Sequence, residues 1–321
     1  ELSSDYHERS KIFGVRHFFY TIGSAVSLIS FYFFIMAEQN DLNSLRDIIF
    51  NHSMIAVIIT AILILLSVYK LREKSDYNRK EISNPYRAYK DVWENKHARL
   101  LIIATFIEHI GSAAIAVLTL YVAQYIVGSA QWAPLFILSY LLPSALSVPL
   151  WIPLSIRFGK IKLWIASKIL AGISFGSMFS ILFIEDINIK IIYVLIAAFF
   201  AGLANGCGST LGPSIQADVI DYDELQTGER KEGSYFAAWS FIYKTSAGVM
   251  LMLTGFSLQI SGFIPNQDQV FEVKLVLATL YCLFPLVCYF IGAFILTKFE
   301  LNEEKCKVIR ESLDSRGKLE V

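Results

Sequence analysis

The stretch Ala217–Lys244, ADVIDYDELQTGERKEGSYFAAWSFIYK, decides how the rest of the chain is interpreted. It joins two long apolar segments. It opens with a group of acidic residues, turns at Thr227-Gly228, passes a patch of mixed charge and enters an apolar helix with a single lysine, Lys244. The acids are Asp218, Asp221, Asp223 and Glu224, and the mixed patch is Glu229, Arg230, Lys231 and Glu232.

Lys244 is predicted to lie near the middle of a membrane. If its helix begins near Gly233, a rise of 1.5 Å per residue places Lys244 roughly 16 Å deep, in a hydrocarbon core about 30 Å thick. A cation at that depth is costly and marks a functional site facing the interior of a bundle. The alternatives are a structural partner for a buried acid and a lysine that snorkels to the interface. Ser240, Gly248 and Gly255 share its helix face, which we expect to pack closely.

The composition is that of a membrane protein. Apolar residues make up 55% of the chain and charged residues only 17%, with a mean hydropathy of +0.51, whereas about a quarter of a soluble domain is charged. The net charge of zero indicates no nucleic-acid partner. The four cysteines lack the spacing of a metal site, and catalytic motifs are absent. An intramembrane enzyme or a channel is therefore the weaker class of function.

Eight apolar runs are long enough to cross a membrane as helices. Basic residues gather in the N-terminal stretch, in 70–99, in Arg157–Lys162 and in the C-terminal tail, while the alternate loops are nearly free of them. Because basic loops stay inside, both ends are predicted to be cytoplasmic. The runs are Phe13–Met36, Ser53–Tyr69, Leu100–Ile126, Pro134–Ile156, Ile161–Ile184, Ile191–Leu211, Gly233–Ile260 and Lys274–Leu296.

Two motifs carry a family resemblance. ADVIDYDELQTGERKEG resembles the loop between helices ten and eleven of the glycoside–pentoside–hexuronide:cation symporters, a branch of the major facilitator superfamily that includes the melibiose carriers. The N-terminal sequence ELSSDYHERSKIFGVR, Glu1–Arg16, resembles the family's loop between helices four and five. The resemblance implies an all-α integral membrane protein, a major-facilitator-type bundle with helices 5–12 of twelve present in a chain truncated at its N-terminus.

The same resemblance implies a domain division and a function. Residues 1–69 would hold the last two helices of the N-terminal half, 70–99 a central loop, 100–297 the six-helix C-terminal half and 298–321 a tail. The implied function is cation-coupled symport of a sugar or glycoside, with Na+ or H+ as coupling ion, by a monomer in a bacterial inner membrane. The partners are a small solute and the lipid bilayer, with no cofactor. The alternative is a non-sugar solute such as a lysolipid or an amino acid.

Five residues are predicted to bind substrate or to couple it to the cation: Lys244, Arg16, Glu108, His109 and Ser240. By resemblance, Lys244 belongs to the family's substrate and coupling machinery, and Arg16 matches a helix-five arginine that contacts sugar. A spacing one residue longer would put His17 at that position instead, and a lipid-bound interfacial arginine is a further alternative. Lys168 lies two turns from the inner edge and is expected to snorkel.

Glu108 and His109 lie near mid-depth in the third run. A desolvated carboxyl there would be a proton site or a partner for Lys244. The alternative is a hydrogen bond between helices. Because neighbouring residues point about 100° apart on a helix, we expect only one of the two to face the centre of a cavity.

Charged residues in both matched loops are predicted to form a cytoplasmic gate, whose charges pair when the inner side is closed. The alternative is a solvated loop. These residues are Asp5, Glu8, Arg9, Asp218, Asp221, Glu224 and Arg230.

The sixth run contains Gly202 and Gly206, whose spacing allows tight helix packing, and Pro213, which is expected to end or kink the helix. The melibiose carriers hold a substrate-stacking tryptophan on this helix, and Ser209 is near its place here.

Overall fold

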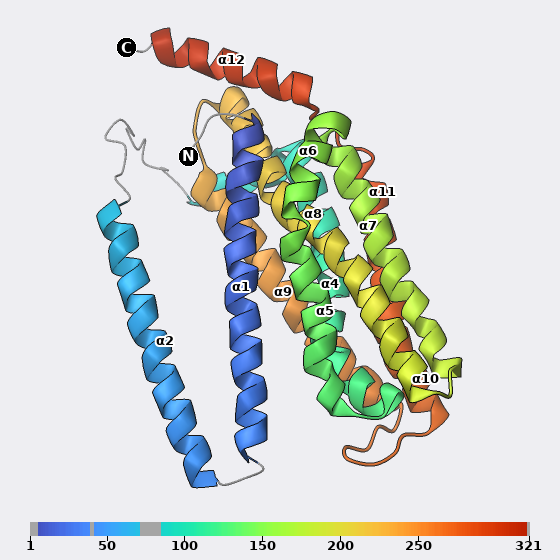
Figure 1. Ribbon diagram of the computed structural model, residues 1–321. Helices are drawn as coiled ribbons and strands as arrows, with labels where there is room; N and C mark the ends of the chain where they lie inside the picture. The colour runs from blue at the N-terminus through green and yellow to red at the C-terminus, as the bar shows by residue number, and fades with distance from the viewer. Residues whose placement is uncertain (1–5, 39–41, 71–84, 320–321) are drawn as a thin grey trace. The chain divides into compact units, whose positions relative to one another are not determined.

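The computed structural model describes residues 6–38, 42–70 and 85–319, and every regular element in this part of the chain is a helix (Figure 1). Seven of these helices are long and apolar enough to cross a membrane, and a bent pair adds an eighth candidate. Each candidate overlaps one of the eight apolar runs in the sequence. The prediction of an all-α membrane bundle is therefore confirmed.

The chain forms two units, which are described separately. The smaller unit, Gly23–Glu81, contains the second part of α1 (Tyr6–Glu38) and the whole of α2 (Leu42–Lys70). Lys70 in the last turn of α2 is favourably placed toward the negative end of the helix dipole. The larger unit, Glu1–Ile22 with Ile82–Val321, contains the start of α1 and all later helices.

In the larger unit the long helices run side by side, and the last helix, α12, lies across one end (Figure 1). The most extensive contacts join α5 to α8, α7 to α8, α11 to α4 and α11 to α7. The helices of this unit after α1 are α3 (Pro85–Glu94), α4 (Lys96–Tyr121), α5 (Ala133–Leu146), α6 (Val148–Phe158), α7 (Lys160–Ser177), α8 (Ile187–Thr227), α9 (Glu232–Ile260), α10 (Phe271–Ala278), α11 (Phe284–Leu296) and α12 (Glu303–Leu319). Four short segments are η1 (Val122–Val127), η2 (Ala130–Trp132), η3 (Met178–Phe183) and η4 (Thr279–Leu283).

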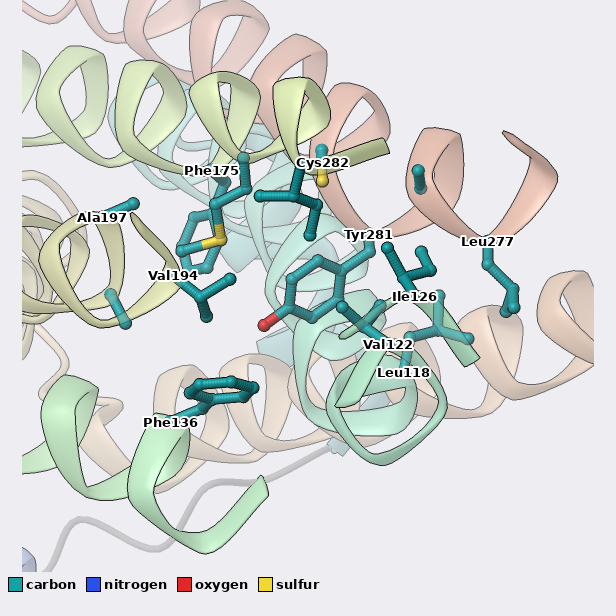
Figure 2. Packing of buried hydrophobic residues seen from close by; sticks show 14 of the residues in the cluster. Leu118, Val122, Ile126, Phe136, Phe175, Val194, Ala197, Leu277, Tyr281 and Cys282 are labelled. Carbon is teal, nitrogen blue, oxygen red and sulfur yellow. The ribbon is translucent and has the colours of Figure 1, made fainter. Parts of the chain in front are cut away.

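Two apolar cores hold this unit together. The first lies toward the end away from α12, where the ring of Tyr281 is surrounded by side chains from several helices (Figure 2). The rings of Phe175 and Tyr289 stack there with their centroids 6.3 Å apart. The second core lies toward α12 and includes Trp164, Leu211 and Cys306.

Glycines bring α8 into close contact with α5. A Cβ atom at Gly202 would lie 2.1 Å from the carbonyl oxygen of Tyr140, and one at Gly206 would lie 2.3 Å from that of Ser144. No side chain fits at such distances, so the two backbones touch. The tight packing predicted from this glycine spacing is confirmed.

The proline-rich run bends at Ser147. Helices α5 and α6 meet there at 50° and together form the eighth candidate span. Pro143 lies inside α5 and Pro153 inside α6, and each removes a backbone hydrogen bond. The indole Nε1 of Trp151 donates to the Leu203 carbonyl at 2.8 Å, which fixes α6 against α8.

Helix α8 is longer than the sequence indicated: Pro213 does not end it, and the expectation of a loop directly after the sixth run was wrong. It has 41 residues, passes through Pro213 and ends at Thr227, where Gly228 adopts a left-handed conformation with φ 72°. The acids expected in a loop therefore lie on the last turns of a helix. Spacing of three residues places Asp218 and Asp221 on one face, where cations from other elements neutralise them.

The charged C-terminal tail is a helix with two faces. In α12, Cys306 and Ile309 are buried in the second core, while Lys305 and Lys307 are exposed. Burial raises the pKa of the Cys306 thiol to about 12. Helix α3 is a second short helix at this end of the bundle, and it lies within 70–99, the hydrophilic stretch predicted to be a central loop.

Candidate functional site

The five predicted binding residues line one cavity in the larger unit. Its volume is about 610 Å³, and its walls come from α1, α4, α7, α8, α9 and α11. Both cores border it, because Trp164 belongs to the core near α12 and Tyr289 to the other. The five residues are Arg16, Glu108, His109, Ser240 and Lys244. Their roles stay predictions, and the structure shows that they share one space.

Lys244 lies on the cavity wall at the thirteenth position of α9. Its ammonium has no ion pair or hydrogen bond within the described ranges. The close packing expected for its face is not found there, because a Cβ at Gly248 or Gly255 would meet no atom within 4 Å. Helix α9 instead contacts α4 through its opposite face, where the Ser246 hydroxyl donates to the Phe106 carbonyl at 3.3 Å.

The partner of Glu108 is Lys168 of α7, and not Lys244. Lys168 does not snorkel, because its side chain is only 2% exposed and its ammonium pairs with the Glu108 carboxylate. The ammonium also lies 4.3 Å from the centroid of the Trp164 ring, within the range of a cation–π contact. The expectation for Lys168 was therefore wrong. A nearby acid and an indole stabilise the charge inside the bundle, so the stem has no need to extend to the interface.

His109 lines the same cavity as Glu108. The cavity extends around α4 far enough for two neighbouring side chains to reach it. The imidazole of His109 lies edge-on to the Tyr243 ring, with the ring centroids 4.7 Å apart. This contact joins α4 to the turn of α9 that contains Lys244.

Arg16 and His17 both line the cavity, but they are held differently. The Arg16 guanidinium lies over the Phe13 ring at 5.0 Å. His17 Nε2 lies 2.8 Å from the Ser144 hydroxyl, which also accepts a hydrogen bond from the Asn205 amide at 2.8 Å. Ser144 thus links α1, α5 and α8. His17 is tied into this linkage, whereas Arg16 has no carboxylate partner in the described part of the chain.

Sequence reasoning missed several cavity residues, most notably two tryptophans. The indole nitrogens of Trp164 and Trp239 and the hydroxyl of Thr105 are buried without a hydrogen-bond partner among the described residues, and all three residues line the cavity. Buried polar groups are normally hydrogen-bonded, so these three atoms are exceptions within the packed wall of the cavity. A tryptophan in an apolar run is ordinarily core, and no sequence signal separated these two from the others.

Helix α8 contributes a wall of small and amide side chains that includes Asn205, Ser209 and Gln216. Pro213 has no N–H to donate to the Ser209 carbonyl, which frees an acceptor at a residue that lines the cavity. The Trp164 ring lies against α8, 3.1 Å from where a Cβ of Gly208 would stand. An indole is thus present close to the expected stacking position, although it comes from α7.

The end of the bundle covered by α12 contains a network of ion pairs, called here the charged end. Lys160 donates to Asp218 at 3.1 Å and to the Ser214 hydroxyl at 2.7 Å. Arg310 of α12 pairs with Asp218 at 2.9 Å and with Asp221 at 3.4 Å. Lys160 is 1% exposed, although it belongs to Arg157–Lys162, which the sequence predicts to be a basic cytoplasmic loop.

A second part of the charged end surrounds the loop after α8. Arg230 pairs with Asp221, Glu224 and Glu232, while Lys231 is buried and pairs with Asp91 of α3 at 2.8 Å. Four of the predicted gate residues therefore meet here: Asp218, Asp221, Glu224 and Arg230. Asp5 and the side chains of Glu8 and Arg9 lie outside the described residues, so pairing across the two matched loops stays a prediction. No group of three metal-ligating side chains is found in the described ranges.

Comparison with known proteins decides the family. A family model described as MFS/sugar transport protein matches residues 1–303. The chain belongs to this family. Its long apolar helices and this family match make it an integral, multi-pass membrane protein.

Curated relatives are similar at low identity. The chain is 26% identical to a glucuronide carrier protein homolog of Escherichia coli over 227 residues, which are 70% of this chain and 49% of the relative. It is 30% identical to the sodium-dependent lysophosphatidylcholine symporter 1 of Xenopus tropicalis over 181 residues, 55% of this chain and 33% of the relative. A sphingosine-1-phosphate transporter of the same organism is 29% identical over 182 residues, 56% and 34% of the two chains. The chain spans at most about half the length of these relatives.

Proposed function

We propose that the protein is a cation-coupled symporter of a sugar or glycoside. The observation that carries this proposal is the meeting of Lys244, Arg16, Glu108, His109 and Ser240 around one cavity, although they come from three helices far apart in the sequence. The volume of about 610 Å³ is within the range of small-molecule sites, roughly 300–1,000 Å³. Charged groups at mid-membrane mark solute pathways.

The walls suit a sugar. Tryptophan rings provide flat apolar surfaces for the C–H face of a pyranose, and Trp164 and Trp239 both line the cavity. Ser209, Asn205 and Gln216 add polar groups on α8. This mixture of apolar surface and a few placed polar groups is typical of small-molecule sites.

The charged end is proposed to be the cytoplasmic gate. Asp221 bridges α12 through Arg310 and the loop after α8 through Arg230, so opening this end requires several ion pairs to separate together. Alternating access between two such packed states is a common switching mechanism.

In this orientation both ends of the chain are cytoplasmic and the membrane is a bacterial inner membrane. Cysteine labelling tests this orientation. A membrane-impermeant reagent should reach Lys305→Cys from the cytoplasm and Asn266→Cys from the outside. Labelling of Asn266→Cys only from the cytoplasm would overturn the orientation.

A lysolipid is the second candidate solute. The observation that favours it is the 30% identity over 181 residues to the lysophosphatidylcholine symporter. The polar lining of the cavity would then bind the headgroup.

Uptake by liposomes that contain the full-length protein tests the proposal. Radiolabelled methyl β-D-glucuronide, methyl β-D-glucoside and lysophosphatidylcholine would be offered under an imposed Na+ or H+ gradient. We expect one of the two sugars to accumulate under one gradient. Accumulation of the lysolipid alone would replace the sugar proposal with the lipid one, and no accumulation under either gradient would contradict symport of these solutes.

A further inference from the structure

The ion pair in the cavity wall carries an inference that rests on the proposed transport function. Glu108 is the one carboxylate among the described residues that line the cavity, while three cations line it: Arg16, Lys168 and Lys244. Pairing of Glu108 with Lys168 leaves the other two cations without a described partner. A cavity with this surplus of positive charge attracts a solute that brings negative charge.

The two members of the pair differ in their access to the cavity. The Glu108 side chain is 17% exposed, whereas that of Lys168 is 2% exposed. Water in the cavity therefore reaches the carboxylate more readily than the ammonium. A proton can arrive on Glu108 from that water without passing through the packed core.

Protonation of Glu108 leaves Lys168 in an unfavourable state. The Lys168 ammonium then keeps only its described cation–π contact with the Trp164 ring, whose centroid is 4.3 Å away. A cation–π contact stabilises an ammonium less than a carboxylate does. A buried ammonium without a counter-charge is strongly destabilised. Another acidic group that enters the cavity would relieve this.

We propose that Glu108 and Lys168 form a proton-for-anion exchange site. A proton binds a carboxylate oxygen of Glu108, the ion pair separates, and the acidic group of the solute takes the place of Glu108 beside Lys168. The O–H bond of Glu108 is the one covalent bond that forms. One proton enters with each acidic group, so a singly charged solute such as a glucuronide is carried without net charge, and linkage makes each ligand strengthen the binding of the other.

Other titratable groups surround the site. On the cavity wall they are His109 of α4, Tyr243 and Lys244 of α9, Tyr289 of α11, and Arg16, His17 and Tyr20 of α1. Cys207 of α8, which is 0% exposed, lies behind the wall next to Lys168. Of these, Arg16 and Lys244 are cations that favour the charged form of Glu108, so a bound anion near them also makes protonation easier.

The backbone of α11 leaves room for the pair to separate. A Cβ at Gly292 would lie 3.9 Å from Glu108 Cβ and 4.0 Å from Lys168 Cδ. The stems of both side chains therefore lie against a residue without a side chain. Either stem can move without displacing a side chain at that position.

Calorimetry on the purified full-length protein tests the exchange. Methyl β-D-glucuronide and methyl β-D-glucoside differ only in the acid, and titration in buffers of different ionisation enthalpy gives the number of protons bound with each. We expect about one proton with the glucuronide and none with the glucoside, by linkage. Glu108→Gln should bind the glucuronide without proton uptake. Lys168→Met should lose about tenfold or more in glucuronide affinity, because an anion left without its cation binds poorly, and should lose less in glucoside affinity.

Three results would overturn the exchange site: glucuronide binding without proton uptake, proton uptake that persists in Glu108→Gln, or binding of the glucoside alone. In the last case sugar transport would stand. Lysophosphatidylcholine bound with a proton uptake that Glu108→Gln abolishes would keep the exchange site and replace the sugar proposal. The double variant Glu108→Gln, Lys168→Met removes both charges together and should keep the thermal unfolding midpoint close to that of the unmodified protein, which separates loss of the site from loss of the fold.

If no probe binds, infrared titration of the ligand-free protein tests whether Glu108 takes up a proton and whether Lys168 opposes this. The carbonyl stretch of a protonated carboxylic acid should appear on acidification, vanish in Glu108→Gln and appear at a higher pH in Lys168→Met. A spectrum in which Glu108→Gln changes nothing would overturn the proposal.

Discussion

Two lysines on one helix, eight residues apart, are both buried and both paired with a carboxylate, yet their surroundings differ. Lys160 at the charged end donates to Asp218 and Ser214, and Asp218 is shared with Arg310. Lys168 in the cavity wall has one described carboxylate partner, Glu108, and the Trp164 ring. The first carboxylate is 4% exposed and the second 17%.

The difference in partners and exposure indicates that the lysine–carboxylate pair of Lys160 holds the charged end together, while that of Lys168 can separate. A buried ion pair is stable only when further hydrogen bonds satisfy both ions. Asp218 meets that condition by sharing two cations, so separating its network requires the concerted movement of α12 and the turn before α7. Glu108 faces a cavity and has a single strong partner, so one proton or one solute is enough to separate the pair.

The largest expected effect on stability is that of Asp218→Asn. It removes the carboxylate charge that Lys160 and Arg310 share, and Lys160 is buried. Removing one partner of a buried pair costs about 3–5 kcal/mol in the free energy of unfolding. Thermal unfolding of the purified full-length protein measures this loss.

The matched control for Asp218→Asn is Glu229→Gln at the same end. The Glu229 carboxylate is 49% exposed and lies 3.9 Å from Lys231, so its loss should cost less than about 1 kcal/mol. A second measurement follows Cys306, whose thiol stays protonated and shielded while α12 is docked because burial raises its pKa to about 12. Asp218→Asn should speed its alkylation by a maleimide, located by mass spectrometry. Equal stability of Asp218→Asn and Glu229→Gln would contradict the expected difference between a buried and an exposed ion pair.

Lys168→Met should have the next largest effect on the free energy of unfolding. It leaves Glu108 without its partner, but this carboxyl faces the cavity and can take up a proton. We therefore expect a loss of about 1–3 kcal/mol, the range for one unsatisfied buried group, and a larger loss at neutral pH than at acid pH. Adding Glu108→Gln should restore most of it. A double variant less stable than Lys168→Met alone would show that the pair is not the source of the loss.

The sequence was sufficient for the fold because the signals that define it are local. Apolar length gives the spans, the spacing of Gly202 and Gly206 gives the contact with α5, and the prolines give the bend at Ser147. It failed where tertiary partners override a local rule. Pro213 does not end α8 because the helix continues into a turn whose acids are neutralised by Lys160 and Arg310.

The candidate site was predicted residue by residue, but its pairing was not. Mid-depth charge identified Lys244 and Glu108, since any charged residue in an apolar run is conspicuous. Which lysine meets Glu108 depends on the packing of α7 against α4 and α11, and that packing is not encoded in spacing along either helix. Trp164 and Trp239 were missed for a related reason, because the sequence alone does not distinguish an indole in a cavity from one in a core.

Gly292→Ala should raise the free energy of unfolding slightly, whereas Asp218→Asn and Lys168→Met lower it. The added Cβ would make ordinary contacts, 3.5 Å from the Ala104 carbonyl oxygen and 3.9 Å from Glu108 Cβ. Alanine in place of glycine inside a helix gains about 0.5–1 kcal/mol. Gly206→Ala is the matched opposite, because its Cβ would lie 2.3 Å from the Ser144 carbonyl oxygen and overpacking costs about 1–3 kcal/mol. Thermal unfolding of both variants should move in opposite directions, and equal shifts would contradict this account of the two helix contacts.

Lys244→Ala should have the smallest effect on stability and the largest effect on transport. Lys244 is exposed on the cavity wall and has no described partner, so its removal leaves no buried charge unpaired and should change the free energy of unfolding by less than about 0.5 kcal/mol. If its ammonium binds the solute or sets the charge of the cavity, uptake of methyl β-D-glucuronide should be lost. Lys274→Ala in α10, a lysine that is not among the cavity-lining residues, is the control for removal of a lysine and should retain most uptake. Normal uptake by Lys244→Ala would remove it from the binding site. A large loss of stability would instead mean that Lys244 supports the fold, and both readings follow from measuring uptake and unfolding on the same preparation.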